Sequence, residues 1–229
     1  MAGVAGQPSV VTSGLVAYYD AANRKSYVSG SKNIFDLAGT SVTGSLKSTL
    51  SFSSSYQGGI VYNGSTTYID LKSADIITST NAFTVDCWYN RVPASVASPV
   101  RLFGNAGSGY TGDYLAISTN GVSIGSSLSI STLIEPSSGL HCVSVTRNVN
   151  DVIMYRDGTS LLTGTISGKT GGNIQVGANF RIGSATNSSG GVGTLVFNGQ
   201  MFILRIYNRA LSSTEVLTNY NATKARFGL

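Results

Sequence analysis

Val152-Ile153-Met154-Tyr155-Arg156-Asp157-Gly158-Thr159-Ser160-Leu161-Leu162 is the stretch that decides the fold, because it predicts a β-hairpin. Two runs suited to strands flank Asp157-Gly158. Both positions of a two-residue type I′ turn need a positive φ, which Asp, Asn and Gly tolerate best. The chain is therefore expected to build antiparallel strands joined by tight turns.

Three further Asn-Gly pairs predict hairpins by the same argument. They are Asn120-Gly121 between residues 114–118 and 122–124, Asn63-Gly64 between 59–62 and 67–71, and Asn198-Gly199 between 195–198 and 201–207.

Further strands are predicted at residues 14–19, 83–90, 100–103, 141–147, 174–176 and 180–182. In the second of these, Phe83, Val85 and Cys87 alternate with polar or amphipathic residues, as expected of a strand with one face on a core. Many short strands with no helical run between them favour an all-β, antiparallel two-sheet sandwich over a parallel α/β sheet.

One segment near the C-terminus predicts a short helix at about residues 213–222. Ser212 and Glu215 have the spacing of a capping box, and apolar side chains recur on one face of the segment. The expected organisation is an N-terminal arm at 1–13, a sandwich domain at 14–220 and a C-terminal tail at 221–229.

Composition excludes several classes of protein. Only 11% of the 229 residues are charged, and the net charge of +5 comes from 15 Lys and Arg dispersed against 10 acids. The longest basic cluster is Arg24-Lys25, so no nucleic-acid footprint is expected. No apolar run is long enough to cross a bilayer, and residues 1–13 do not have the pattern of a secretory signal peptide.

The two cysteines and the single histidine predict no disulfide and no zinc site. Cys87 and Cys142 fall on opposite strand faces by alternation, so both are expected to be packed, reduced thiols. His141 has neither a second histidine nor a Cys-x-x-Cys motif to complete a zinc ligand set.

Several segments carry a resemblance to a known family. They are Gly14-Leu15-Val16-Ala17-Tyr18-Tyr19-Asp20-Ala21-Ala22-Asn23 with 26–27 and 36–37, then 61–65 with 68–69, then Phe83-Thr84-Val85-Asp86-Cys87-Trp88, then 141–147, then Arg205-Ile206-Tyr207-Asn208-Arg209-Ala210-Leu211-Ser212 with Glu215 and 221–223. In this order they resemble the concanavalin A-like, laminin-G-like jelly-roll domains of structural proteins of tailed bacteriophages. The resemblance implies a jelly-roll sandwich, synthesis in the host cytoplasm and a place on the virion surface.

The residues do not predict an enzyme. Glycosidases that retain configuration need two carboxyl groups about 5–5.5 Å apart, and the only glutamates are Glu135, in an expected loop, and Glu215, expected to cap the helix. No Gly-x-Ser-x-Gly elbow accompanies His141. Calcium is a common ligand of the resembled family, and Asp113, Asp151 and Asp157 lie in expected loops, but no calcium or other cofactor is predicted.

A carbohydrate site would need an exposed aromatic ring beside amide and carboxyl groups. The predicted site combines Tyr110 and Tyr114 with Asn105 and Asp113. Tyr56 and Trp88 are further aromatic candidates, although a packed role explains most tyrosines and the tryptophan of a β-rich chain.

The resemblance implies a non-enzymatic head decoration or cement protein that binds the major capsid protein or another virion protein and assembles as a homotrimer. The alternative is a tail-fibre or receptor-binding module for host-surface carbohydrate. Candidate anchoring residues are Val4, Val10 and Val11 in the arm, Phe202 in the apolar segment 201–204 where related proteins often have an acid, and Phe227 and Leu229 in the tail.

Overall fold

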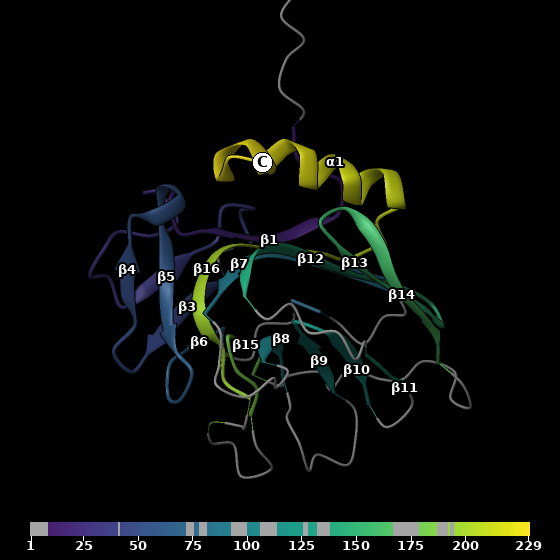
Figure 1. Cartoon of the computed structure of the whole chain (residues 1–229), viewed down its shortest axis with the longest axis horizontal. Helices are drawn as coiled ribbons and strands as arrows, with labels where there is room; N and C mark the ends of the chain where they lie inside the picture. The colour runs from purple at the N-terminus through teal and green to yellow at the C-terminus, as the bar shows by residue number, and fades with distance from the viewer. Residues whose placement is uncertain are drawn as a thin grey trace, which may run out of the picture.

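The chain folds as a sandwich of two antiparallel sheets, with one helix lying across the outer face of the first sheet (Figure 1). The structure, a computed structural model, describes residues 9–40, 42–71, 76–77, 82–92, 100–105, 114–125, 128–131, 138–166, 179–186, 192 and 195–229. The expected all-β sandwich is confirmed.

The first sheet, sheet A, runs in the order β14-β13-β12-β7-β16-β5-β4, and β1 also pairs with β16. Its strands are β1 (Leu15–Asp20), β4 (Ser51–Ser53), β5 (Gly59–Asn63), β7 (Ala82–Arg91), β12 (Gly139–Asn148), β13 (Asp151–Arg156), β14 (Thr159–Thr165) and β16 (Asn198–Tyr207). A short 3-10 turn, η1 (Ser55–Gln57), joins β4 to β5.

The second sheet, sheet B, runs in the order β11-β10-β9-β8-β15-β6-β3-β2. Its strands are β2 (Asn33–Phe35), β3 (Thr43–Lys47), β6 (Tyr68–Asp70), β8 (Arg101–Gly104), β9 (Leu115–Ser118), β10 (Gly121–Ile124), β11 (Leu128–Ser131) and β15 (Arg181–Ile182).

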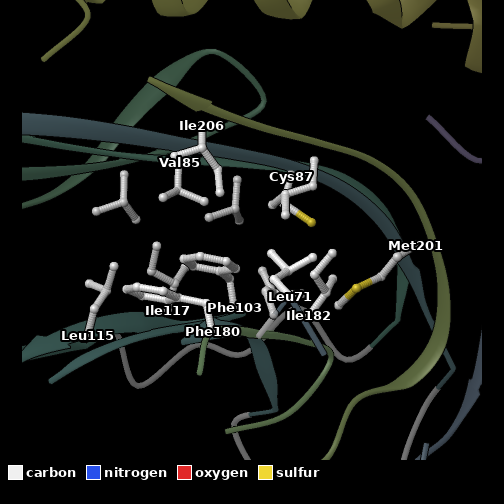
Figure 2. Packing of buried hydrophobic residues seen from close by; sticks show 14 of the residues in the cluster. Leu71, Val85, Cys87, Phe103, Leu115, Ile117, Phe180, Ile182, Met201 and Ile206 are labelled. Carbon is white, nitrogen blue, oxygen red and sulfur yellow. The ribbon is translucent and has the colours of Figure 1, made fainter. Parts of the chain in front are cut away.

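The main core fills the space between the sheets. Val85 and Ile206 of sheet A face Phe103 and Ile117 of sheet B, as Figure 2 shows, and Phe103 stacks on Phe180 with ring centroids 5.1 Å apart. Burial of each such side chain contributes about 1.5–3 kcal/mol to folding. The expected inward face of β7 is therefore confirmed.

The outer face of sheet A is buried as well, because the C-terminal segment covers it. Helix α1 (Ser213–Lys224) and the 3-10 turn η2 (Ala225–Phe227) lie over it (Figure 1). Trp88 points to this side and is fully buried, with its ring stacked on Phe227 at 4.3 Å and on Tyr220 at 5.4 Å between centroids. Trp88 is thus a packing residue and not a sugar platform.

Helix α1 begins as predicted and ends later than predicted. The capping box is confirmed: Ser212 Oγ accepts a hydrogen bond from Glu215 N, while Glu215 Oε2 accepts one from Ser212 N. The helix continues to Lys224, and Phe227 beyond it is buried. The expected boundary at residue 221 therefore falls inside the helix, and the tail is packed on the sandwich.

Two of the four predicted hairpins are confirmed. β13 and β14 pair across Asp157-Gly158, whose φ values of 52° and 79° give the required positive values. β9 and β10 also pair, but their turn falls on Thr119 and Asn120 because β10 already begins at Gly121. The strand predicted at 174–176 lies outside the described residues.

The hairpin predictions at Asn63-Gly64 and Asn198-Gly199 are wrong. β5 pairs with β4 and β16 in sheet A, whereas β6 pairs with β3 and β15 in sheet B, so the Asn63-Gly64 turn carries the chain from one sheet to the other. Gly199 lies within the single strand β16, where a Cβ atom would collide with Asn90 O of β7. Close backbone approach, and not a turn, requires this glycine.

A buried ion pair joins β7 and β16 beneath the C-terminal helix. Arg205 Nη2 lies 2.6 Å from Asp86 Oδ2, and both side chains are at most 1% exposed. Cys142 Sγ and Ser144 Oγ donate to the other carboxylate oxygen at 3.0 and 3.1 Å. Both cysteines are buried free thiols, as predicted, and burial raises the pKa of Cys87 and of Cys142.

Candidate functional site

The described part of the predicted carbohydrate site is not an open platform. Tyr110 and Asp113 lie outside the described residues. Asn105 is only 3% exposed, and its Oδ1 accepts a hydrogen bond from Leu115 N at 2.7 Å, so this oxygen holds β8 to β9. Tyr114 is half-buried and immediately precedes β9. The prediction for Asn105 as a sugar ligand is therefore corrected to a structural role.

The predicted anchoring residues fall into two groups. Phe202 and Phe227 are buried and pack on each other at 5.2 Å between ring centroids, so these two side chains hold the C-terminal segment and are not free for a partner. Leu229 is 57% exposed and Val10 is half-buried. Val11 is held by the chain itself, since its N–H donates to Asn219 Oδ1. Val4 lies outside the described residues.

Of the acids weighed as calcium ligands, Asp113 lies outside the described residues, while Asp151 begins β13 and Asp157 follows its other end. Asp157 Oδ1 accepts from Cys142 N, and its Oδ2 pairs with His141 Nδ1, while Asp151 accepts from Thr165 Oγ1. Asp36 uses both carboxylate oxygens on Tyr18 N, Ala38 N and Thr40. Across the described ranges, no three His, Cys, Asp or Glu side chains gather at one point.

A groove with two lobes lies at the β4 edge of sheet A, where β1 ends and η1 turns. The polar lobe has a volume of about 400 Å³, and the apolar lobe beside it has a volume of about 380 Å³. Both fall within the size of ligand pockets. Asp20, Ala22, Asn23, Arg24, Gln57 and Arg226 line the polar lobe; Ala21, Ala22, Arg24, Tyr27, Val28, Ser29 and Phe52 line the apolar lobe. Arg24 and Ala22 belong to both, so the lobes form one continuous surface, which we call the two-lobed groove.

Arg226 ties the walls of the two-lobed groove together. Its Nη1 donates to Asp20 Oδ1 at 2.8 Å, its Nη2 to Gly58 O at 2.9 Å and its Nε to Tyr56 O at 3.3 Å. The Asp20 and Arg226 side chains are 14% and 13% exposed, so water screens this pair only in part. One guanidinium thereby connects the end of β1, the η1 turn and the C-terminus.

The η1 turn has an unusual backbone. Tyr56 and Gln57 have φ values of 52° and 66°, and Gly58 follows at 126°. Consecutive residues with positive φ cost free energy unless the surroundings hold them, and such strain is concentrated at ligand sites. Gly58 is required here because a Cβ atom would lie 2.8 Å from the Phe52 ring. The turn therefore packs tightly against the apolar lobe.

The strained turn presents an aromatic ring to solvent. The Tyr56 side chain is 41% exposed and rests edge-on against Phe202, at 5.6 Å between ring centroids, and against Phe227 at 6.3 Å. Because two buried rings support it, Tyr56 is held in place beside the residues that line the polar lobe. Tyr56 itself lines neither lobe, but its neighbour Gln57 lines the polar lobe, so an exposed ring lies next in sequence to the amide, guanidinium and carboxylate groups of the groove.

Sequence patterns indicated this groove only in part. Tyr56 was among the candidate aromatics, and Arg24-Lys25 was the longest basic cluster. The contribution of Asp20 and Arg226 was missed, because 206 residues separate them and no local pattern predicts that they meet. The run of positive φ values was also hidden, since Tyr56 and Gln57 are not residue types that favour that conformation.

A two-sheet antiparallel jelly roll with one C-terminal helix and a surface groove defines the class as a lectin-like sandwich. The chain belongs to the concanavalin A-like lectin/glucanases superfamily, whose family model matches residues 63–217. The residues that line the two-lobed groove all lie outside this matched segment. Among curated proteins, none matches the chain. None of the described helices is long and apolar enough to cross a membrane.

Solved structures share the fold at low sequence identity. Domain 4 of AbnA, a GH43 extracellular arabinanase from Geobacillus stearothermophilus in complex with arabinotriose, has a TM-score of 0.67 at 17% identity and covers 90% of this chain and 98% of its own. Trypanosoma rangeli sialidase in complex with sialic acid has a TM-score of 0.67 at 17% identity, and the match covers 95% of this chain but 34% of the sialidase. The binding domain of botulinum neurotoxin DC in complex with SialylT has a TM-score of 0.65 at 10% identity, covering 93% and 52%. These likenesses establish the fold.

Proposed function

We propose that this chain is a non-catalytic carbohydrate-binding module and that the two-lobed groove is its binding site. The observation that carries the proposal is the strained, exposed Tyr56 beside a polar lobe of ligand size. A sugar ring has an apolar face and a polar edge. The first suits an aromatic ring, and the second suits the amides and charged groups of the groove.

The groove is organised before any ligand arrives. Arg226 holds the carbonyls of Tyr56 and Gly58, and Phe202 and Phe227 support the Tyr56 ring. A site that is already ordered loses less conformational entropy on binding and so binds more tightly for the same contacts. The smaller entropy loss compensates for the weak contacts that a single sugar ring makes.

Binding without catalysis agrees with the state of the described carboxyl groups. Asp20 is paired with Arg226, Asp86 with Arg205 and Glu215 with Arg209. Hydrolysis of a glycoside by two carboxyl groups needs one of them as a proton donor. The hydrogen bond from Arg209 instead lowers the pKa of Glu215 from 4.5 to about 2, which keeps this glutamate ionised.

The fold neighbours support a carbohydrate ligand as a class. One is described as a domain in complex with arabinotriose, and another is a toxin binding domain in complex with SialylT. The support is for the kind of ligand and not for a particular sugar.

A glycan array tests the proposed site. Tyr56→Ala should abolish binding of whichever glycans the wild-type chain retains, whereas Leu217→Ala, which truncates an exposed side chain on α1, should leave binding intact. Both variants must show the wild-type circular dichroism spectrum. If Tyr114→Ala loses glycan binding while Tyr56→Ala retains it, the binding site lies on sheet B, and its assignment to the two-lobed groove is refuted.

We also propose, on the sequence resemblance, that the module works on the surface of a tailed-bacteriophage particle. The sequence favours a homotrimeric head decoration protein on the capsid. A glycan-binding groove favours the alternative, a tail-fibre or receptor-binding module for host-surface carbohydrate. Cryo-electron microscopy of the particle with labelled chain distinguishes them, since decoration requires many copies over the shell and a receptor-binding module requires few copies at the tail. Absence of the chain from purified particles would refute both.

A further inference from the structure

The charged groups of the two-lobed groove do not balance. Its walls contain one carboxylate, Asp20, and two guanidiniums, Arg24 and Arg226. Arg226 lies 2.8 Å from Asp20 and neutralises it. Arg24 is exposed and has no hydrogen-bond or ion-pair partner among the described residues. One positive charge therefore remains uncompensated in the groove.

We infer that the groove binds an acidic saccharide, and that Arg24 recognises its carboxylate. This inference rests on the proposed function, because it names the class of sugar taken by the same site. Arginine presents its N–H donors in a planar fork that matches a carboxylate with two parallel hydrogen bonds. Arg24 is the residue of the groove that has this fork unoccupied.

The position of Arg24 determines where the acid group lies. Arg24 lines both lobes, so a carboxylate bound to it lies at their junction. On one side the ligand meets Asn23 and Gln57, whose side-chain amides can hydrogen-bond sugar hydroxyls. On the other side it meets Tyr27 and Phe52, whose rings lie 5.8 Å apart between centroids.

The apolar lobe adds a second requirement. Val28 is 52% exposed on its wall, Ala21, Ala22, Tyr27 and Phe52 are the other apolar residues there, and Arg24 and Ser29 supply its polar groups. A ligand that covers apolar surface of this kind removes it from water, which makes the free energy of binding more favourable. The bound sugar therefore places a carboxylate beside an apolar face or an acyl substituent, with the hydroxyl edge in the polar lobe.

The test is an array of matched glycan pairs. Each uronic-acid glycan is printed beside its carboxyl-reduced neutral counterpart and beside a sulfated form of the neutral glycan. The wild-type chain should prefer the carboxylated member by roughly tenfold, as expected for a charge-assisted contact at a partly solvated site. Raising the salt concentration should reduce this preference.

Three variants assign the preference to Arg24. Arg24→Ala should bind the two members of each pair equally. Arg24→Lys should keep part of the preference, because it retains the charge without the fork. Lys25→Ala is the matched control, since Lys25 is the exposed neighbour of Arg24 and lines neither lobe. It should bind as the wild type does.

The outcomes separate this inference from the proposed function. Equal wild-type binding of carboxylated and neutral partners, with Tyr56→Ala losing both, would overturn the acidic specificity and leave the groove as the carbohydrate site. Preference for the sulfated member would also overturn the assignment to a carboxylate. A preference that survives Arg24→Ala would exclude Arg24. Failure to bind any glycan would refute the proposed function itself.

Discussion

Arg226 Nη1 lies 2.8 Å from Asp20 Oδ1, although 206 residues separate the two in the chain. The contact fastens the C-terminal turn to the end of β1, and the same guanidinium holds the carbonyls of Tyr56 and Gly58. The tail is therefore part of the wall of the two-lobed groove. The segment that carries the predicted anchoring residues Phe227 and Leu229 thus also supplies a residue that lines this groove.

Arg226→Ala should weaken glycan binding much more than it weakens the fold. The substitution frees three acceptors around η1, so the strained turn loses the contacts that order it and binding must restore that order. We expect at least a tenfold loss of affinity, measured by calorimetry with a glycan from the array, with a loss of about 1–3 kcal/mol in the free energy of unfolding. Lys224→Ala, two residues earlier, is the control. Unchanged affinity in Arg226→Ala would show that η1 holds its conformation alone.

Asp86→Asn should destabilise the fold strongly. It leaves the guanidinium of Arg205 buried without a counter-charge, since both side chains are at most 1% exposed. Removal of one partner of a buried ion pair costs about 3–5 kcal/mol. Urea unfolding followed by circular dichroism measures this loss. The double variant Asp86→Leu with Arg205→Met should recover much of the stability, and a double variant less stable than Asp86→Asn would contradict this account.

The C-terminal turn should determine the wavelength of tryptophan emission, because it covers Trp88, the only tryptophan of the chain. The indole is fully buried and stacks on Phe227. Phe227→Ala should shift the emission to the red as water reaches the ring, and should cost about 3–5 kcal/mol of stability. Leu229→Ala removes an exposed side chain nearby and should leave the spectrum unchanged. An unshifted spectrum in Phe227→Ala would mean that other residues keep Trp88 dry.

Glu215 should make the stability depend on pH in acid. The hydrogen bond from Arg209 is the main cause that lowers its pKa from 4.5 to about 2, and the bond from Ser212 N adds to it. Because the folded pKa lies below the unfolded value, the contribution is complete above about pH 4.5 and is lost as the pH falls towards 2. The pair is one-third exposed, so the effect is modest.

Thermal melts of the wild type and Glu215→Gln between pH 6 and pH 2 measure this dependence. The two melting temperatures should differ most at the upper end and converge in acid. Thr214→Ala, an exposed neighbour, controls for substitution within the first turn of α1. A difference that grows as the pH falls would contradict a lowered pKa for Glu215 in the folded chain.

Local sequence patterns predicted the elements well and their partners less well. The capping box at Ser212 and Glu215 and the hairpin at Asp157-Gly158 depend on neighbours in sequence, so both were predicted and confirmed. The Asn-Gly pairs at Asn63-Gly64 and Asn198-Gly199 do not form hairpin turns. The first connects two sheets, and the second permits close packing of β7 on β16. An Asn-Gly pair indicates that the backbone tolerates a positive φ, but only the tertiary structure shows whether the chain forms a hairpin there.

The candidate site was less predictable than the fold. Asn105 was expected to face a sugar, yet its amide oxygen bonds Leu115 N within sheet B. The position of a polar residue near an aromatic one in the sequence does not determine whether its side chain faces solvent or bonds to a neighbouring strand. The groove depends instead on contacts between β1, η1 and η2, which are distant in the chain.

Alternation of apolar and polar residues and the turn-forming pairs determined by themselves that this chain forms an antiparallel sandwich with one capped helix, because these properties depend on spacing along the chain. The tertiary structure alone decided that the outer face of sheet A is buried, that the C-terminal turn lies against Trp88, and that Arg226 meets Asp20 beside a strained Tyr56. Those contacts join residues that are far apart in the chain, and they form only once sheet A has assembled and the C-terminal segment lies on its outer face.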